Sequence, residues 1–153
     1  MKAFYGGRGG DRGPRVGWET GKLGNWERGL ERADLTERVI AAAIAVHTEL
    51  GPGFLEATYE AALVLEMATR GIPFVRQPSV PIFYRDQKVG RHRLDVLAFD
   101  QIVVELKAVD RVHPIHRLTV QAYLKATGNR IDLLLNFAAI PLGITRVTYR
   151  TPQ

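Results

Sequence analysis

Two charged residues lie close together in a segment that is otherwise apolar. Residues 102–108 read Ile-Val-Val-Glu-Leu-Lys-Ala, a pattern typical of a β-strand, with Glu105 two positions before Lys107. Side chains alternate between the two faces of a strand, so Glu105 and Lys107 share one face. Two charges on a largely buried strand are costly unless each has a partner. We therefore expect a counter-charge or a metal ion beside them.

Asp95, in the preceding strand, is the nearest candidate for that partner. Directly opposed residues of an antiparallel pair share a face, so the loop between the two strands decides where Asp95 points. A two-residue loop would oppose Asp95 to Leu106, whereas a three-residue bend at residues 99–101 opposes it to Glu105. We predict the three-residue bend, because only an odd loop brings Asp95 to the face of Lys107.

These three residues could carry out metal-assisted hydrolysis. Two facing carboxylates repel each other unless a cation lies between them, and carboxylate oxygens suit Mg²⁺ or Mn²⁺. Lys107 beside such an ion could orient a water molecule and stabilise charge on a phosphoryl group. The set of Asp95, Glu105 and Lys107 therefore fits phosphodiester hydrolysis. A surface salt bridge on a half-exposed sheet is the alternative, because Asp followed by Glu-X-Lys is a loose pattern.

A helix expected at residues 54–70 offers a further carboxylate. Glu56 falls in its first turn, on the same side as Tyr59. An acidic residue in a first turn also interacts favourably with the helix dipole, which is the alternative role for Glu56. Glu60 and Glu66 are expected to be solvent-exposed.

The period of the apolar residues defines the elements that position this site. Asp34 with Glu37 resembles a capping box, and Gly51-Pro52-Gly53 terminates the helix that follows it. We predict helices at 34–50, 54–70 and 113–127, and strands at 75–84, 89–98, 102–108, 131–137 and 144–150. The order ααβββαββ indicates an α/β (α+β) domain with a mixed sheet of about five strands flanked by helices.

Composition narrows the class of protein. The 153 residues fit one domain, and the net charge of +5 favours an anionic partner such as nucleic acid. The absence of cysteine excludes disulfides, thiolate metal sites and a cysteine nucleophile. No apolar run approaches the roughly 20 residues that span a bilayer, and no secretory signal is visible. We expect a cytoplasmic protein with no membrane partner.

Residues 1–33 differ in composition from the rest of the chain. They are rich in glycine and arginine and offer little apolar surface, so we expect disorder there. Such a segment is either a basic arm that contacts phosphates or an extension without a fold, and we favour the second. The folded domain is expected to cover residues 34–153.

Several motifs resemble those of the bacterial GxxExxY protein family. Gly53, Glu56 and Tyr59 match the signature from which that family takes its name. The flanking matches, in chain order, are residues 45–47, 51–56, 104–108, 123–125, 127–128 and 134–137. The resemblance covers about residues 35–149, which is essentially the whole expected domain.

The resemblance implies a PD-(D/E)XK nuclease-like protein with a restriction-endonuclease-like core. It implies Asp95, Glu105 and the peptide carbonyl of Leu106 as ligands of Mg²⁺ or Mn²⁺. It further implies Lys107 as the catalytic lysine and Glu56 as the acidic residue contributed by a helix.

Residues around these positions are candidates for substrate binding. The candidates are Arg91, Arg93, His116, Gln121, Tyr123 and Lys125. Relatives often carry glutamine at the position of Thr119, so the resemblance leaves substrate positioning by this helix in doubt. Capping of the helix is the alternative role for His113 and His116, and a solvated strand end is the alternative for the arginines.

Two functions follow from these patterns. The first is a Mg²⁺-dependent nuclease that acts on DNA. The second is a module that retains the fold without useful turnover and binds nucleic acid or a protein partner. A structural component that forms a homodimer is a third alternative.

Overall fold

The computed structural model describes residues 29–129 and 131–150. The disorder expected for residues 1–33 therefore falls, for residues 1–28, outside the described part of the chain. In chain order the elements are α1 (Gly29–Leu50), α2 (Glu56–Thr69), β1 (Phe74–Arg76), β2 (Ser79–Tyr84), β3 (Gln87–Arg93), β4 (Val96–Ala98), β5 (Ile102–Lys107), α3 (Pro114–Thr127), β6 (Ile131–Asn136) and β7 (Gly143–Thr148). None of the helices in these ranges has the length and apolar composition needed to cross a bilayer.

Five strands form one mixed sheet, in the order β1-β4-β5-β6-β7. β5 and β6 run parallel, and α3 connects them, whereas the other neighbouring strands are antiparallel. The strands β2 and β3 form a separate two-stranded sheet. The expected α+β architecture with a mixed sheet of about five strands is confirmed, and it is consistent with a restriction-endonuclease-like core.

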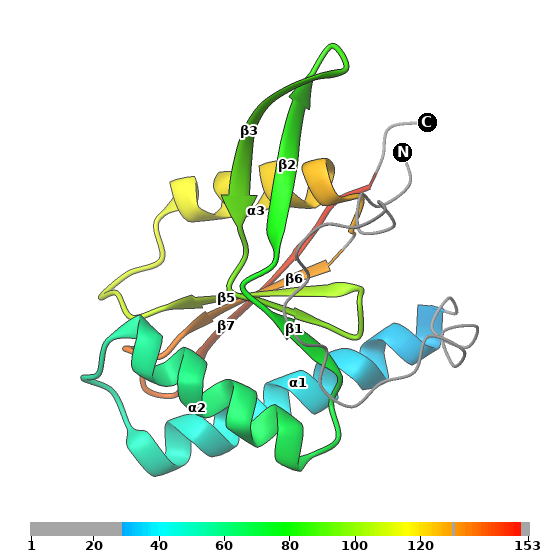
Figure 1. The fold of residues 1–153 in the computed structure, drawn as a ribbon. Coiled ribbons are helices and arrows are strands. Elements are labelled where there is room, and N and C mark those ends of the chain that lie inside the picture. Colours follow the sequence, from blue (N-terminus) through cyan, green and yellow to red (C-terminus); the bar gives the residue numbers. More distant parts are fainter. Residues whose placement is uncertain (1–28, 130, 151–153) are drawn as a thin grey trace.

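Helices cover both faces of the five-stranded sheet, with α1 and α2 on one face and α3 on the other (Figure 1). The alternation of side chains along β5 explains the two layers, because Val104 and Leu106 pack towards α2 while Val103 faces α3. The larger core lies on the side of α1 and α2, and its fully buried side chains include Tyr59, Leu63, Met67, Phe99 and Phe137.

The first helix begins at Gly29, ahead of the start predicted at Asp34. Glycine apart, residues 29–33 are good helix formers, so the helical conformation extends through the expected cap. The helix ends where expected, because Gly51 adopts a φ of 67° and its N–H donates to the His47 carbonyl.

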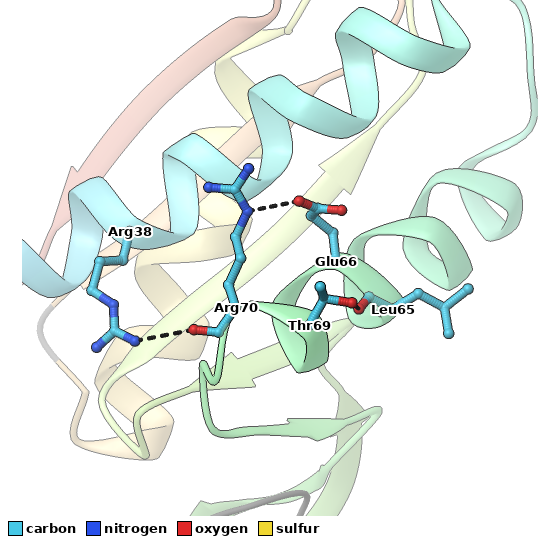
Figure 2. Close-up of polar contacts among 5 residues, drawn as sticks. All are labelled: Arg38, Leu65, Glu66, Thr69 and Arg70. Atoms are coloured by element: carbon cyan, nitrogen blue, oxygen red, sulfur yellow. Dashed lines mark hydrogen bonds and ion pairs between the residues drawn. The ribbon is translucent and has the colours of Figure 1, made fainter.

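Figure 2 shows one polar contact that joins α1 to the end of α2, and two more within the end of α2 itself. Arg38 Nη2 donates to the carbonyl of Arg70 at 3.4 Å. Arg70 Nε donates to Glu66 Oε1 at 2.7 Å, and Thr69 Oγ1 donates to the Leu65 carbonyl at 3.0 Å. These exposed contacts fix the last turn of α2 before the chain enters the sheet.

The strands expected at 75–84 and 89–98 are each divided in two. The first is interrupted at Gln77, which has a φ of 52°, and at Pro78, which has no N–H for a strand ladder. The inner halves, β1 and β4, join the five-stranded sheet, and the outer halves, β2 and β3, leave it. This division places a hairpin outside the sheet directly before the residues of interest.

Candidate active site

The hairpin register brings Asp95 opposite Glu105, as the sequence predicts. Ala98 pairs with Ile102 across the three-residue bend, and Val96 pairs with Val104. The ladder ends at Val96, and directly beyond it the side chain of Asp95 lies within hydrogen-bond reach of that of Glu105. Two left-handed residues, Phe99 at φ 54° and Asp100 at φ 58°, form the bend.

The carboxyl group of Glu105 is held in its protonated form. Burial, followed by the charges of Asp95 and Asp132, raises the pKa of Glu105 to about 9. A hydrogen bond to Asp95 also favours the proton, and the charge of Lys107 opposes it. Glu105 is only 8% exposed, and within the described part of the chain its Oε1 atom has no hydrogen-bond partner. The carboxyl group thus presents one buried oxygen atom to which a ligand could bind.

Asp95 is held in place by the backbone of β5. Its Oδ2 atom accepts a hydrogen bond from the Leu106 N–H at 2.8 Å. Burial raises the pKa of Asp95, this backbone bond lowers it, and the nearby charges of Glu60 and Glu56 raise it again. Four carboxyl groups are therefore close enough to influence one another electrostatically.

The helix α2 carries Glu56 to the end of β5. Glu56 is the first residue of α2, and its Oε1 atom accepts from the Ala108 N–H at 3.4 Å. Its side chain is exposed, so it borders the site on the solvent side. The first turn of α2 therefore supplies an acidic side chain next to Lys107, whose neighbour Ala108 it contacts.

Tyr59 of the Gly53-Glu56-Tyr59 signature has a structural role. Its hydroxyl donates to the Gly51 carbonyl at 2.5 Å and accepts from the Phe54 N–H at 3.1 Å. The ring is fully buried and stacks on Phe137 with centroids 4.5 Å apart. Tyr59 thus fixes the turn between α1 and α2, and thereby the position at which α2 begins.

Aromatic residues border the site on the side of α3. The ring of His92, from β3, stacks on Tyr123, from α3, with centroids 3.4 Å apart and planes tilted by 14°. Burial and the charge of Lys107 lower the pKa of His92, and burial and the charge of Glu105 raise the pKa of Tyr123. Tyr123, a residue predicted to bind substrate, is therefore close enough to Glu105 to interact with it electrostatically.

The other predicted substrate-binding residues are distributed over two elements. Arg91 and Arg93 are exposed on β3, and Gln121 and Lys125 are exposed on α3. His116 caps α3, because its Nδ1 atom accepts from the His113 N–H at 3.1 Å. The alternative capping role of this histidine pair is confirmed by that contact and by the His113 ring, which accepts from the Ile115 N–H.

Asp132 is a further buried acid, which the motif patterns did not single out. Asp132 lies in β6, opposite Val103 of β5, and it is fully buried. Within the described residues, neither of its carboxyl oxygens has a hydrogen-bond partner. Burial, with a smaller effect of Asp95, raises its pKa well above the usual range. A carboxylic acid inside the apolar run at 131–137 was the available sequence signal.

Glu60 is also buried, so its expected exposure on the surface of α2 is wrong. Its Oε1 atom accepts from Arg76 Nε at 2.7 Å and from Gln77 Nε2 at 3.0 Å. Helical spacing places Glu60 near the buried Tyr59 and Leu63, but it cannot show that β1 supplies these partners. Glu66 is partly exposed and pairs with Arg70.

The donor set at this site suits a hard divalent cation. Asp95 and Glu105 face each other, and the unpartnered Oε1 atom of Glu105 is a buried oxygen that a cation would satisfy. Oxygen donors of this kind favour Mg²⁺ or Mn²⁺. Over residues 29–129 and 131–150, no three His, Cys, Asp or Glu side chains gather closely enough to hold an ion by themselves. The two carboxylates would need a further donor, and the Leu106 carbonyl and water are candidates.

A family model described as PD-(D/E)XK nuclease superfamily matches residues 33–147, which is most of the chain. The chain therefore belongs to the PD-(D/E)XK nuclease superfamily. No curated protein and no solved structure matches the chain.

Proposed function

We propose that this chain is a Mg²⁺- or Mn²⁺-dependent nuclease that hydrolyses phosphodiester bonds of DNA. The observation that carries the proposal is the pairing of Asp95 with Glu105, on the strand face that also holds Lys107. Membership of the PD-(D/E)XK nuclease superfamily supports the same reaction class. The motifs around Gly53, Glu56 and Tyr59 further support assignment to the GxxExxY proteins of bacteria.

Asp95, Glu105 and the Leu106 carbonyl would hold the metal ion. When bound there, the ion would lower the pKa of a water molecule and neutralise charge on the phosphoryl oxygens. The Leu106 N–H orients Asp95 for this role, since it fixes one carboxyl oxygen at 2.8 Å. Because Glu105 is protonated in the free protein, its proton must leave when its oxygens bind a cation.

Lys107 and Glu56 complete the catalytic set. The charge of Lys107 acts on both Glu105 and His92, so its ammonium group lies near both side chains. In that position it orients the attacking water and balances negative charge that develops on the phosphate. Glu56 borders the same end of β5 and completes the acidic cluster there.

Substrate contacts come from both sides of the carboxylates. Arg91 and Arg93 on β3, together with Tyr123, His116, Gln121 and Lys125 on α3, supply positive charge, hydrogen bonds and a stacking surface. A chain with a net charge of +5 is suited to an anionic polymer.

A binding module without turnover is the second candidate, and the hydrogen bond between Asp95 and Glu105 favours it. That bond joins the two carboxyl groups directly, and a protein that never loads a metal ion would keep it. Such a module would still bind nucleic acid, whereas a homodimeric structural component would bind neither metal ion nor DNA.

Cleavage of linear, nicked and branched DNA in Mg²⁺ or Mn²⁺ tests the proposal. We expect the wild type to cut at least one of these substrates, and Lys107→Ala to lose activity by about 10²-fold or more. Glu66→Gln is the matched control, because Glu66 pairs with Arg70 on the far end of α2. Equal background from the wild type and Lys107→Ala would overturn the proposal.

A further inference from the structure

The strands β2 and β3 continue the hairpin of β1 and β4 beyond the five-stranded sheet. The pairing runs in one register from Phe74 and Ala98 outward to Ile82 and Gly90. Between the two halves, the Gln77 N–H donates to the Asp95 carbonyl at 2.8 Å. We call residues 79–93 the arm. Its base is therefore hydrogen-bonded to the residue whose side chain faces Glu105.

Contacts on two sides fix the direction of the arm. At the base, Glu60 accepts from both Arg76 and Gln77, so α2 holds the point at which the hairpin bends. On the inner face, Val80 packs in the apolar cluster beneath α3, and the ring of His92 stacks on Tyr123. Figure 1 shows the arm crossing α3 and extending beyond it.

The outer face and the tip of the arm are basic. Arg91 and Arg93 pair with Pro81 and Ser79, on the face opposite to Val80 and His92. Both arginines are exposed, and Arg91 Nε donates to Ser79 Oγ at 2.9 Å, which orients its side chain along the arm. The arm carries four cationic side chains, those of Arg85, Lys88, Arg91 and Arg93, and one acidic side chain, that of Asp86.

The tip combines charge with an exposed aromatic ring. A two-residue turn, Arg85-Asp86, connects the strands, with both residues at positive φ. The Arg85 guanidinium lies over the ring of Tyr84, 5.3 Å from its centroid, and Tyr84 is 61% exposed. Arginine side chains contact phosphates and base edges in protein–DNA interfaces, so Arg85 at this exposed tip is suited to such contacts.

We propose that the arm enters the major groove of duplex DNA and thereby holds a phosphodiester bond at the carboxylates. This inference rests on the proposed function, because that function names DNA as the substrate. A two-stranded ribbon fits the major groove of B-DNA, about 12 Å wide and about 8.5 Å deep, whereas the major groove of A-form RNA is too narrow for side chains to read. Strand β2 has six residues, and at roughly 3.4 Å per residue the arm spans about 20 Å, enough to cross the groove.

Binding assays without divalent metal test the arm separately from catalysis. Fluorescence anisotropy in EDTA is measured with a short labelled DNA duplex, the matching single strand and an RNA duplex. The wild type should bind the DNA duplex most tightly. Arg91→Gln/Arg93→Gln should bind it about tenfold more weakly or worse, with the slope of log K against log salt reduced by about 2.

The control removes the same charge elsewhere. Arg146→Gln/Arg150→Gln alters two exposed arginines at the β7 end of the chain, and it should leave affinity within about twofold of wild type if the arm is the contact. Equal weakening by both double variants would show that only net charge matters and would overturn the inference. Circular dichroism checks that both variants fold.

A blocked groove gives a second readout. The blocked duplex carries bulky sugar groups on the major-groove edge of cytosine. Wild type should bind this duplex more weakly than plain DNA. Arg91→Gln/Arg93→Gln should bind the blocked and the plain duplex with equal affinity. Equal wild-type affinity for plain and blocked duplexes contradicts the inference. If the arm variants weaken DNA binding but the wild type does not cleave DNA in Mg²⁺, only the nuclease proposal is refuted. If the wild type cleaves DNA and the arm variants cleave it equally well, only the inference about the arm is refuted.

Discussion

At the scale of single residues, the main feature is a group of acids in an environment that disfavours their charge. Glu105 has two partners, because it forms a hydrogen bond with Asp95 and lies near the charge of Lys107. A proton or a bound ligand can therefore stabilise its carboxyl group. Asp132 has no hydrogen-bond partner within the described chain and lies in the apolar cluster on the α3 side of the sheet. The first acid has the surroundings of a working group, and the second is a source of instability.

Replacing Asp132 should stabilise the protein. Asp132→Val removes a buried carboxyl group without hydrogen-bond partners and keeps a residue suited to a strand, so we expect the free energy of unfolding to rise by about 1–3 kcal/mol. Urea unfolding measures this change. Loss of stability instead would mean that Asp132 has a favourable partner in the folded protein.

The gain from removing Asp132 should depend on pH. The pKa of Asp132 is higher in the folded state than in the unfolded state, where it is about 3.9. The folded state therefore binds more protons, and its stability falls as the pH rises above the pKa of the unfolded state. Asp132→Asn removes this titration, and its advantage over wild type should therefore be larger at about pH 8 than at about pH 5. Unfolding curves at the two pH values check the sign, and an advantage that does not change with pH would contradict it.

The hydroxyl of Tyr59 should contribute to stability through the turn between the first two helices. Tyr59→Phe keeps the stack on Phe137 and removes bonds to Gly51 and Phe54, so we expect a loss of about 1–2 kcal/mol. Tyr84→Phe is the control, because Tyr84 is exposed at the tip of the arm. Similar effects of the two substitutions would show that the buried hydroxyl has no special role.

At the scale of elements, the bend between β1 and β2 determines where the arm points. Gln77 adopts a left-handed conformation there, and Glu60 binds its side chain together with that of Arg76. A single buried acid on α2 thus connects a helix to the base of the hairpin that carries Asp95.

Replacing Glu60 should loosen that bend. Glu60→Gln weakens two charge-assisted hydrogen bonds, so we expect a loss of about 1–3 kcal/mol and faster amide exchange at Gln77 and Leu94, whose N–H groups bridge the bend. Glu66→Gln breaks an exposed pair and should cost less than about 0.5 kcal/mol. Unchanged exchange in Glu60→Gln would contradict a fixed bend.

Sequence patterns were sufficient for the hairpin that builds the site and insufficient for the bend. Once a three-residue bend is assumed, alternation along the two strands places Asp95 beside Glu105, and the pairing of Ala98 with Ile102 agrees with that bend. The bend depends on Glu60, and helical spacing cannot tell a buried acid from a solvated one when its partners come from another element. Likewise, the capping pattern at Asp34 did not stop α1, since no breaker lies between Gly29 and Asp34.

At the scale of the whole molecule, the site lies where the two helical layers meet the end of β5. Glu56 approaches from the layer of α1 and α2, and Tyr123 approaches from α3 on the other face. The match to the superfamily, residues 33–147, spans both layers and the arm. The carboxylates, the arm and α3 therefore all lie within the part of the chain that the superfamily model matches.

Binding of Mn²⁺ tests the central claim, that Asp95 and Glu105 form the metal site, most directly. Isothermal titration calorimetry in buffers of different ionisation enthalpy measures both affinity and released protons. Because the pKa of Glu105 is about 9, the account predicts that wild type releases about one proton per ion at neutral pH. Glu105→Gln should bind at least about tenfold more weakly and release none, while Glu66→Gln should behave as wild type. Binding and proton release that are the same in Glu105→Gln as in wild type would contradict the account.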